Sequence, residues 1–215
     1  MDARQVYPQA DVAALATAAQ HGDRRRIAEL VASGVDPNAR GDKGINLLQW
    51  ALLHQNRDGL DALLKAGADP SVQDESGSTV MHFAAGAADA TFMATLIANQ
   101  APLDARNGAG ETALFSALLG GRDAQFEQLL QAGADVDASS RRGDTPLHQA
   151  ALVNNFGAIL SLLAKGANPE AVNFQGVDFM RYASMTPAYL LTDEAAADYA
   201  AIVRWLSGKG FAVPG

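Results

Sequence analysis

The sequence predicts an all-α solenoid of about six helix-turn-helix units, and three observations predict it. Small and aliphatic residues recur every 33 residues along most of the 215-residue chain. Each repeat holds two stretches of helical periodicity, separated by a short break. A fixed period of this length is typical of stacked units, each of which buries its apolar face against its neighbours. One column is alanine in six successive units: Ala18, Ala51, Ala84, Ala117, Ala150 and Ala183.

The clearest copy of the unit spans residues 143–168, GDTPLHQAALVNNFGAILSLLAKGAN. Thr145 can cap the first free amides of a helix, and Pro146 suits the first helical position because it needs no donor there. Asn154 tolerates the left-handed conformation and is expected to end this helix. A second helix follows and stops at Gly166. In the alanine column, only a small side chain lets a helix of one unit lie close to the next.

The period divides the chain into a polar lead-in, residues 1–10, and a single domain, residues 11–215. We expect the lead-in to be loose. The units span about 11–42, 43–75, 76–108, 109–141, 142–174 and 175–215. The first unit lacks the Thr-Pro pair and begins its second helix with three arginines, which is typical of a terminal cap.

The sixth unit departs from the period. It begins in register at Gly176, but its second helix starts about ten residues late, after an insert that includes residues 184–192. On one interpretation, the insert belongs to a modified C-terminal cap that seals the stack. On the other, it is a partner-binding element, because insertions in solenoids usually lie in exposed loops.

These motifs resemble those of ankyrin-repeat proteins over residues 11–178. The marks are Gly-x-Thr-Pro-Leu-His-x-Ala-Ala at residues 143–151 and Gly-Ala-Asp or Gly-Ala-Asn at residues 67–69, 133–135 and 166–168. The resemblance implies antiparallel helix pairs joined by hairpin-like fingers and curved into a concave binding face. The departures are Asn46-Leu47 in place of Thr-Pro, and Gln100-Ala101-Pro102 in place of Gly-Ala-Asp, which makes the finger after Gln100 less predictable.

Composition limits the function classes. The formal net charge of −8 argues against a nucleic-acid partner, which rewards a positive field. The absence of cysteine excludes disulfides and cysteine-based metal sites. The sequence contains no run of 18 or more apolar residues, so it predicts no membrane span, and its start has no signal-peptide core. As written, the sequence predicts a cytoplasmic protein; a periplasmic location follows if a leader preceded it.

No motif predicts catalysis, a cofactor or a metal. The sequence has no phosphate-binding loop, nucleophile elbow or His-Glu-x-x-His motif. His82 and His148 occupy one repeat column, and the resemblance implies that this histidine bridges the backbones of neighbouring fingers. Asp36, Asp69 and Asp135 also share a column and are interpreted as turn residues. We therefore expect a protein that is not an enzyme.

The candidate site is the concave face that the resemblance implies, built from finger tips and from the exposed ends of the first helices. Large apolar residues at helix ends favour an interaction surface; the alternative is that adjacent units half cover them. The aromatic column Trp50, Phe83 and Tyr182 is interpreted as core. The expected partner-binding residues are Asp42, Lys43, Ile45, Leu53, His54, Glu75, Glu111, Leu119, Arg141, Arg142, Asp144, Leu152, Val153 and Phe174.

Two functions remain open at this stage. The first is a protein-binding module that neutralises its partner by occlusion, similar to bacterial ankyrin-repeat immunity proteins that block secreted toxins such as lipase effectors. Its toxin would be encoded next to it, and the free protein is expected to be a monomer. The second is a scaffold or stress-related helper that stabilises a partner enzyme. The two differ in whether the partner's activity falls or rises on binding.

Overall fold

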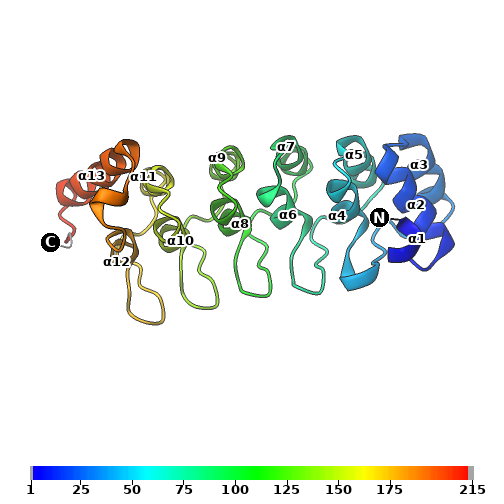
Figure 1. Cartoon of the computed structure of the whole chain (residues 1–215). Coiled ribbons are helices and arrows are strands. Elements are labelled where there is room, and N and C mark those ends of the chain that lie inside the picture. Colours follow the sequence, from blue (N-terminus) through cyan, green and yellow to red (C-terminus); the bar gives the residue numbers. More distant parts are fainter. Residues whose placement is uncertain (1, 213–215) are drawn as a thin grey trace.

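The computed structural model describes residues 2–212, with only the backbone of Ala188, and confirms the all-α solenoid. Two rows of helices run side by side along the molecule, and the fingers project from one edge (Figure 1). Within residues 2–212 there is no strand, and a single isolated bridge joins Arg40 and Asn46. The first row comprises α2 (Ala10–His21), α4 (Leu47–Leu53), α6 (Val80–Gly86), α8 (Ala113–Leu119), α10 (Pro146–Leu152) and α12 (Phe179–Ala183). The second row comprises α3 (Arg24–Ala32), α5 (Arg57–Lys65), α7 (Thr91–Ala98), α9 (Asp123–Ala132), α11 (Phe156–Ala164) and α13 (Asp193–Gly208).

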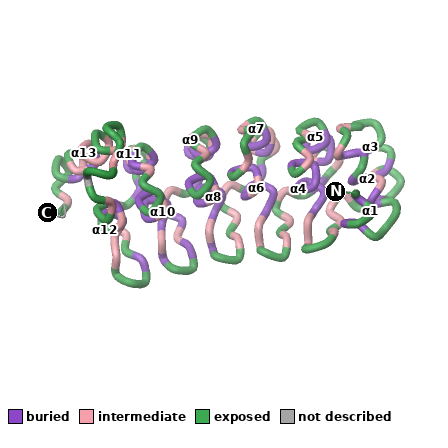
Figure 2. Tube along the Cα trace, viewed as in Figure 1, coloured by how far each residue is buried: buried purple, intermediate pink, exposed green. Residues whose placement is uncertain are grey.

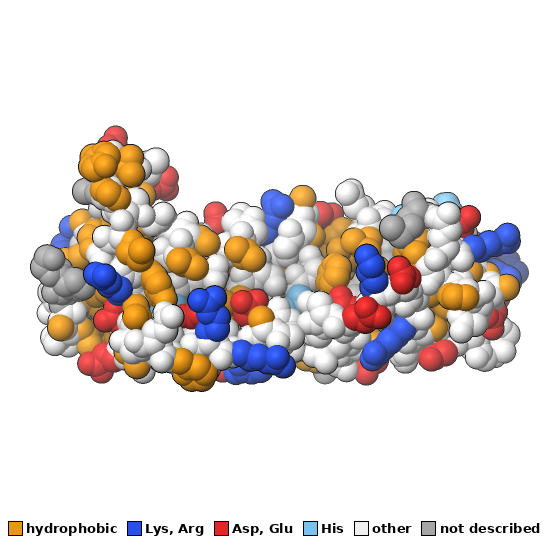
Figure 3. All heavy atoms as spheres, turned by 60° about the horizontal axis from the view of Figure 1, so that its bottom comes forward, with side chains coloured by type: hydrophobic (Ala, Val, Ile, Leu, Met, Phe, Trp, Pro, Cys, Tyr) orange, Lys and Arg blue, Asp and Glu red, His pale blue; other side chains and the backbone are white. Residues whose placement is uncertain are grey.

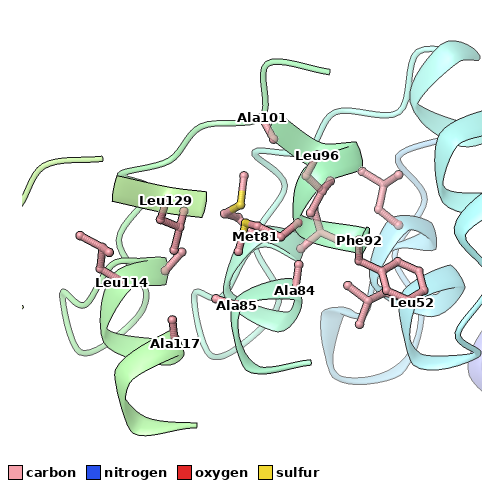
Figure 4. Packing of buried hydrophobic residues seen from close by; sticks show 14 of the residues in the cluster. Leu52, Met81, Ala84, Ala85, Phe92, Leu96, Ala101, Leu114, Ala117 and Leu129 are labelled. Carbon is pink, nitrogen blue, oxygen red and sulfur yellow. The ribbon is translucent and has the colours of Figure 1, made fainter. Parts of the chain in front are cut away.

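The core lies between the two rows and continues through the stack (Figure 2). All six residues of the alanine column are buried. Figure 4 shows Ala84 and Ala117 among larger side chains such as Met81 and Leu114. Because interiors are close-packed, a larger residue in this column would force adjacent helices apart. The alanine column therefore sets the close approach of one unit to the next.

Helix boundaries follow local chemistry. Thr145 occupies the N-cap of α10 and Pro146 its first turn, as expected. Asn154 has a φ of 55°, in the left-handed region, and ends the first helix of its unit. Gln100 also adopts a positive φ, 58°, where the corresponding positions of other units are glycine. The finger after Gln100 thus keeps the family turn despite its unusual sequence.

The fingers are held by backbone hydrogen bonds of two kinds. Within a finger, an amide donates to a carbonyl four residues later, as from Asn107 to Glu111 at 2.9 Å. Between fingers, each tip donates to the preceding one: Glu75 to Lys43, Gly108 to Ser76, Arg141 to Ala109 and Phe174 to Arg142, at 2.8–3.2 Å. Neighbouring fingers are therefore fixed relative to one another, which gives the side chains at their tips defined positions.

The lead-in is packed, and the expectation that it is loose was wrong. Residues Ala3–Val6 form a short helix, α1, and the Tyr7 side chain is fully buried. The Tyr7 ring meets the Trp50 ring edge to face at 5.6 Å, and its hydroxyl donates to the carbonyl of Ile45 at 3.3 Å. The sequence pattern missed this contact because Trp50 is distant in the chain and the lead-in lies outside the repeat.

The sixth unit closes the stack with α13, which packs on α11. Ile202 and Leu206 are buried, and Tyr199 meets Phe156 edge to face at 5.6 Å. The insert between α12 and α13 contains a short 3-10 helix, η2 (Ala188–Leu190). Leu191 of the insert packs against the core, whereas Met185, Tyr189 and Leu190 are exposed. The cap thus seals the core through α13 and leaves much of the insert at the surface.

A candidate protein-binding face

We call the surface formed by the finger tips and by the exposed C-terminal ends of the first-row helices the finger face. Asp42, Lys43, Glu75, Arg141 and Arg142 are exposed at the tips of the fingers. Glu111 and Asp144 lie half-buried beside them, and Phe174 is 83% exposed at the last tip. Viewed with the fingers forward, the molecule carries charges of both signs and several hydrophobic clusters (Figure 3). The face therefore offers both apolar and ionic contacts.

Exposed apolar side chains follow the ends of the first-row helices. Leu53, Leu119, Leu152 and Met185 occupy one column of the 33-residue period and are 50–72% exposed. We call these four residues the apolar row. Leu53 is 50% exposed, so the alternative that adjacent units half cover these residues stays open for it, whereas Leu119 at 72% keeps most of its side chain accessible. Exposed leucines that recur in one column of the repeat favour contact with another molecule.

The row is interrupted at the third unit, where the column holds Gly86. There the Arg122 guanidinium donates to the carbonyl of Gly86 at 3.1 Å, and the Gln125 amide donates to that of Ala87. These side chains satisfy the free carbonyl groups at the C-terminal end of α6. The apolar row is therefore divided into Leu53 on one side and a longer run, Leu119, Leu152 and Met185, on the other.

Three of the expected site residues lie elsewhere or are engaged. Ile45 is half-buried and packs against the core. The His54 ring packs against Trp50 with the ring centroids 4.1 Å apart and the planes inclined by 43°, and its Nδ1 donates to the carbonyl of Trp50. Val153 lines a hollow between α9, α11 and α13, on the second-row side. Consecutive residues at a helix end point in different directions, so Leu152 and Val153 face different surfaces.

The aromatic column proved to be of mixed burial. Trp50 is fully buried, and its indole donates to the carbonyl of Ala16 at 3.0 Å. Phe83 and Tyr182 are half-buried and pack against the core. The interpretation of this column as core therefore holds for Trp50 and in part for the other two residues.

The two column histidines bridge neighbouring fingers, as the resemblance implied. Thr145 donates its amide to Nδ1 of His148 at 3.1 Å, and Nε2 of His148 donates to the carbonyl of Val177 at 2.9 Å. His82 makes the same pair of bonds, to the Thr79 amide and the Glu111 carbonyl. Because an amide can only donate, Nδ1 must be unprotonated, so both imidazoles are neutral in this arrangement.

Glutamine performs the same task one unit earlier. Gln49 accepts the Asn46 amide at 3.0 Å and donates to the carbonyl of Ser78 at 3.1 Å. The column thus shows that an uncharged amide side chain can replace the bridging histidine.

This equivalence predicts a pH effect at His82. Burial lowers the pKa of His82, although the Glu111 carbonyl and the Asp74 and Glu111 charges oppose the shift. Below the ordinary histidine pKa of about 6.5, the unfolded chain binds a proton more readily than the folded chain, so stability falls as the pH falls. His82→Gln should remove the part of this pH dependence that comes from His82. That part is at most about 1.4 kcal/mol of unfolding free energy per pH unit.

The measurement is urea unfolding of wild type and His82→Gln above and below that pKa. The other three histidines are common to both proteins, so the comparison isolates His82. Equal losses of stability on acidification in the two proteins would contradict the prediction.

The fourth unit breaks the bridging pattern. Phe115 stands in the column of Gln49, His82 and His148, and its ring cannot accept or donate. Thr112, the N-cap residue of α8, is fully buried, and its hydroxyl oxygen has no hydrogen-bond partner. Buried polar groups without partners are rare in native structures, so this one needs an explanation.

A pocket of about 150 Å³ lies on the finger face beside Phe115. Leu152 of the apolar row lines it, together with Tyr182 from the last unit. Two carboxylates, Glu111 and Asp144, and the Arg142 guanidinium supply its charges. Its lining residues come from fingers and first-row helices of the fourth, fifth and sixth units. The remaining lining residues are Ser140, His148 and Gln149.

A second, more open hollow of about 610 Å³ lies between α9, α11 and α13. The carboxylates of Asp123, Glu127, Glu194 and Asp198 line it. Within residues 2–212, no group of three or more histidine or acidic side chains is placed to hold a metal ion. In the same part of the chain, none of the helices combines the length and apolar character that a membrane crossing requires.

Sequence reasoning gave the insert as an alternative partner-binding element but did not place Met185, Tyr189 or Leu190, which are exposed, among the expected site residues. A signal was present for Met185, since it lies 33 residues after Leu152. A hydrophobic projection stands out at the C-terminal end of the molecule, on the left of Figure 3, and this is the end at which α12 and α13 flank the insert (Figure 1). The last unit thus extends the apolar row.

The fold and this face define a repeat-built scaffold that presents a preformed surface. A family model described as ankyrin repeats (3 copies) matches residues 48–140 and again residues 81–173. The chain belongs to the ankyrin-repeat family. Its repeats mark it as a protein–protein interaction module, and the fold is typically a non-enzymatic binding scaffold.

Solved structures agree on the fold. An ankyrin repeat domain from Acinetobacter baumannii AYE is 24% identical, with a TM-score of 0.75, over 92% of this chain and 98% of that one. The ankyrin repeat protein EF0377 is 22% identical, with a TM-score of 0.73, over 88% and 96%. The ankyrin repeat domain of Bcl-3, a member of the IkappaB family, is 27% identical, with a TM-score of 0.77, over 93% and 86%. A search of curated proteins finds no match.

Proposed function

We propose that this protein binds a protein partner on the finger face. The observation that carries the proposal is the apolar row, whose four large side chains remain exposed after the first-row helices of the second, fourth, fifth and sixth units. Full burial of such a side chain contributes about 1.5–3 kcal/mol, and each of these has half or more of its surface left to bury. Arg141 and Arg142 lie exposed at a finger tip, and arginine is favoured at binding hot spots because its guanidinium pairs with carboxylates.

The finer proposal is that binding neutralises the partner. A rigid face that is locked by bonds between fingers suits occlusion of another protein's active site, with little change of shape on binding. In this proposal the protein acts as bacterial ankyrin-repeat immunity proteins do, and a toxin encoded beside the gene is the expected partner. The alternative is a scaffold or helper that stabilises a partner enzyme. Occlusion lowers the activity of the bound enzyme, whereas the helper preserves or raises it.

The test is affinity capture from the native host with wild type, Leu152→Asp and Val153→Asp side by side. The two residues are neighbours at one helix end, but Leu152 lines the finger-face pocket and Val153 lines the other hollow. We expect the partner to be captured by wild type and Val153→Asp and lost with Leu152→Asp, because the substitution removes apolar contact area and would bury a carboxylate beside Glu111 and Asp144. Charge reversal by Arg141→Glu together with Arg142→Glu should also abolish capture of the partner.

Circular dichroism and thermal melting show whether each variant is folded. Capture that survives both Leu152→Asp and the double arginine variant would exclude the finger face and move the site elsewhere. Adding the captured protein back to its own assay then separates neutralisation from stabilisation.

A further inference from the structure

The missing bridge at Phe115 marks a position where the chain gives up a stabilising interaction. Units two, three and five each join their helix start to the next finger through Gln49, His82 or His148. The fourth unit keeps the N-cap threonine but leaves its hydroxyl buried without a partner. A buried polar group without a hydrogen-bond partner is destabilising. Departures from a local rule of this kind are expected at functional positions, where another requirement outweighs stability.

The substitution changes the chemistry of the finger face at one place. Phe115 is 3% exposed, and the small part of its ring that stays accessible lines the pocket described above, which Tyr182 also lines. At about 150 Å³ the pocket is smaller than the roughly 300–1,000 Å³ of sites for drug-sized molecules. It therefore fits one side chain of a partner.

The charges of the pocket favour a cationic side chain. Glu111 and Asp144 contribute two carboxylates, and Arg142 contributes one guanidinium, whose Nε lies 3.9 Å from Oδ2 of Asp144. The lining thus carries a net charge of −1 by this count. Both ring nitrogens of His148 are already used in its bridge. A planar guanidinium can stack on aromatic rings and form paired hydrogen bonds with a carboxylate, which an ammonium cannot do.

We propose that the Phe115 pocket is a specificity site that receives one arginine side chain of the protein partner. The proposal deepens, and rests on, the assignment of the finger face as the binding surface. In it, Tyr182 provides the stacking surface, the edge of Phe115 completes the apolar part of the lining, and Glu111 and Asp144 bind the guanidinium. Leu152 contacts the aliphatic stem and the surrounding apolar residues of the partner.

The test uses n-butylguanidinium, which reproduces an arginine side chain, titrated into the full-length ¹⁵N-labelled protein. We expect saturable shifts of the Gln149, Leu152 and Tyr182 amides with a dissociation constant in the millimolar range. Phe115→His should abolish these shifts while raising the urea midpoint, because the imidazole can bridge the Thr112 amide and the Asp144 carbonyl as His82 and His148 do in their units.

A second variant keeps the test decisive if Phe115→His fails to fold. Glu111→Gln retains the shape of the pocket and removes one carboxylate, and it should weaken binding about tenfold. Absence of saturable shifts in wild type, or equal affinity in wild type and Glu111→Gln, would overturn the proposal. These outcomes are independent of the capture experiment: capture lost with Leu152→Asp but no guanidinium binding would retain the finger face and reject only the arginine pocket.

Discussion

Gly59→Ala is expected to destabilise the protein by about 3 kcal/mol or more. Gly59 lies in the first turn of α5, where that helix crosses α2. A Cβ atom at this position would lie 1.9 Å from the carbonyl oxygen of Ala19, and that oxygen belongs to the helix backbone, which cannot rotate away. The helices must separate, which also strains the bond from the Asn56 side chain to the carbonyl of Gln20. Urea unfolding followed by circular dichroism measures the effect.

Gly157→Ala is the matched control. Gly157 also lies in the first turn of a second-row helix, α11, but a Cβ there would meet its nearest neighbour, Oδ2 of Asp198, at 3.5 Å, an ordinary contact. The control should be neutral, or stabilise by up to about 1 kcal/mol through helix propensity. If the two variants unfold at the same urea concentration, the close approach of α5 to α2 does not exist in solution.

Tyr7→Ala is expected to cost about 3–5 kcal/mol, as large aromatic truncations in cores do. The variant loses the edge-to-face contact with Trp50 and the hydroxyl bond to Ile45, and it leaves a cavity under α1. In a stack, the loss should unfold the N-terminal units before the rest. Trp50 fluorescence reports this end once the other tryptophan, Trp205, is replaced by phenylalanine.

Tyr189→Ala is the control for Tyr7→Ala, because it removes a tyrosine that is 84% exposed in the insert instead of a buried one. Its urea midpoint should match that of wild type, whereas Tyr7→Phe should lose only about 1 kcal/mol with the hydroxyl. A Tyr7→Ala protein as stable as Tyr189→Ala would mean that the lead-in is loose, as the sequence pattern had suggested.

Local sequence predicted most of the fold. Thr145 and Pro146 start a helix, Asn154 ends it, and the alanine column brings the units together, because capping, left-handed turns and side-chain size act over a few residues. Because each unit packs against a near copy of itself, the repeat also determines which types of residue meet between neighbouring units. The repeat column grouped His82 with His148, and the resemblance to ankyrin-repeat proteins implied that they bridge neighbouring fingers.

Contacts outside the period required the tertiary structure. Tyr7 packs on Trp50, 43 residues away, and no local pattern connects them. Leu152 and Val153 face different surfaces because the helix end turns between them, which periodicity at the level of whole units does not resolve. The column itself places Phe115 where a bridge should be, but only the folded chain shows that its ring lines a charged pocket and leaves the Thr112 hydroxyl unpaired. Repeats specify a scaffold through short-range chemistry, whereas its site depends on side chains that converge from separate units.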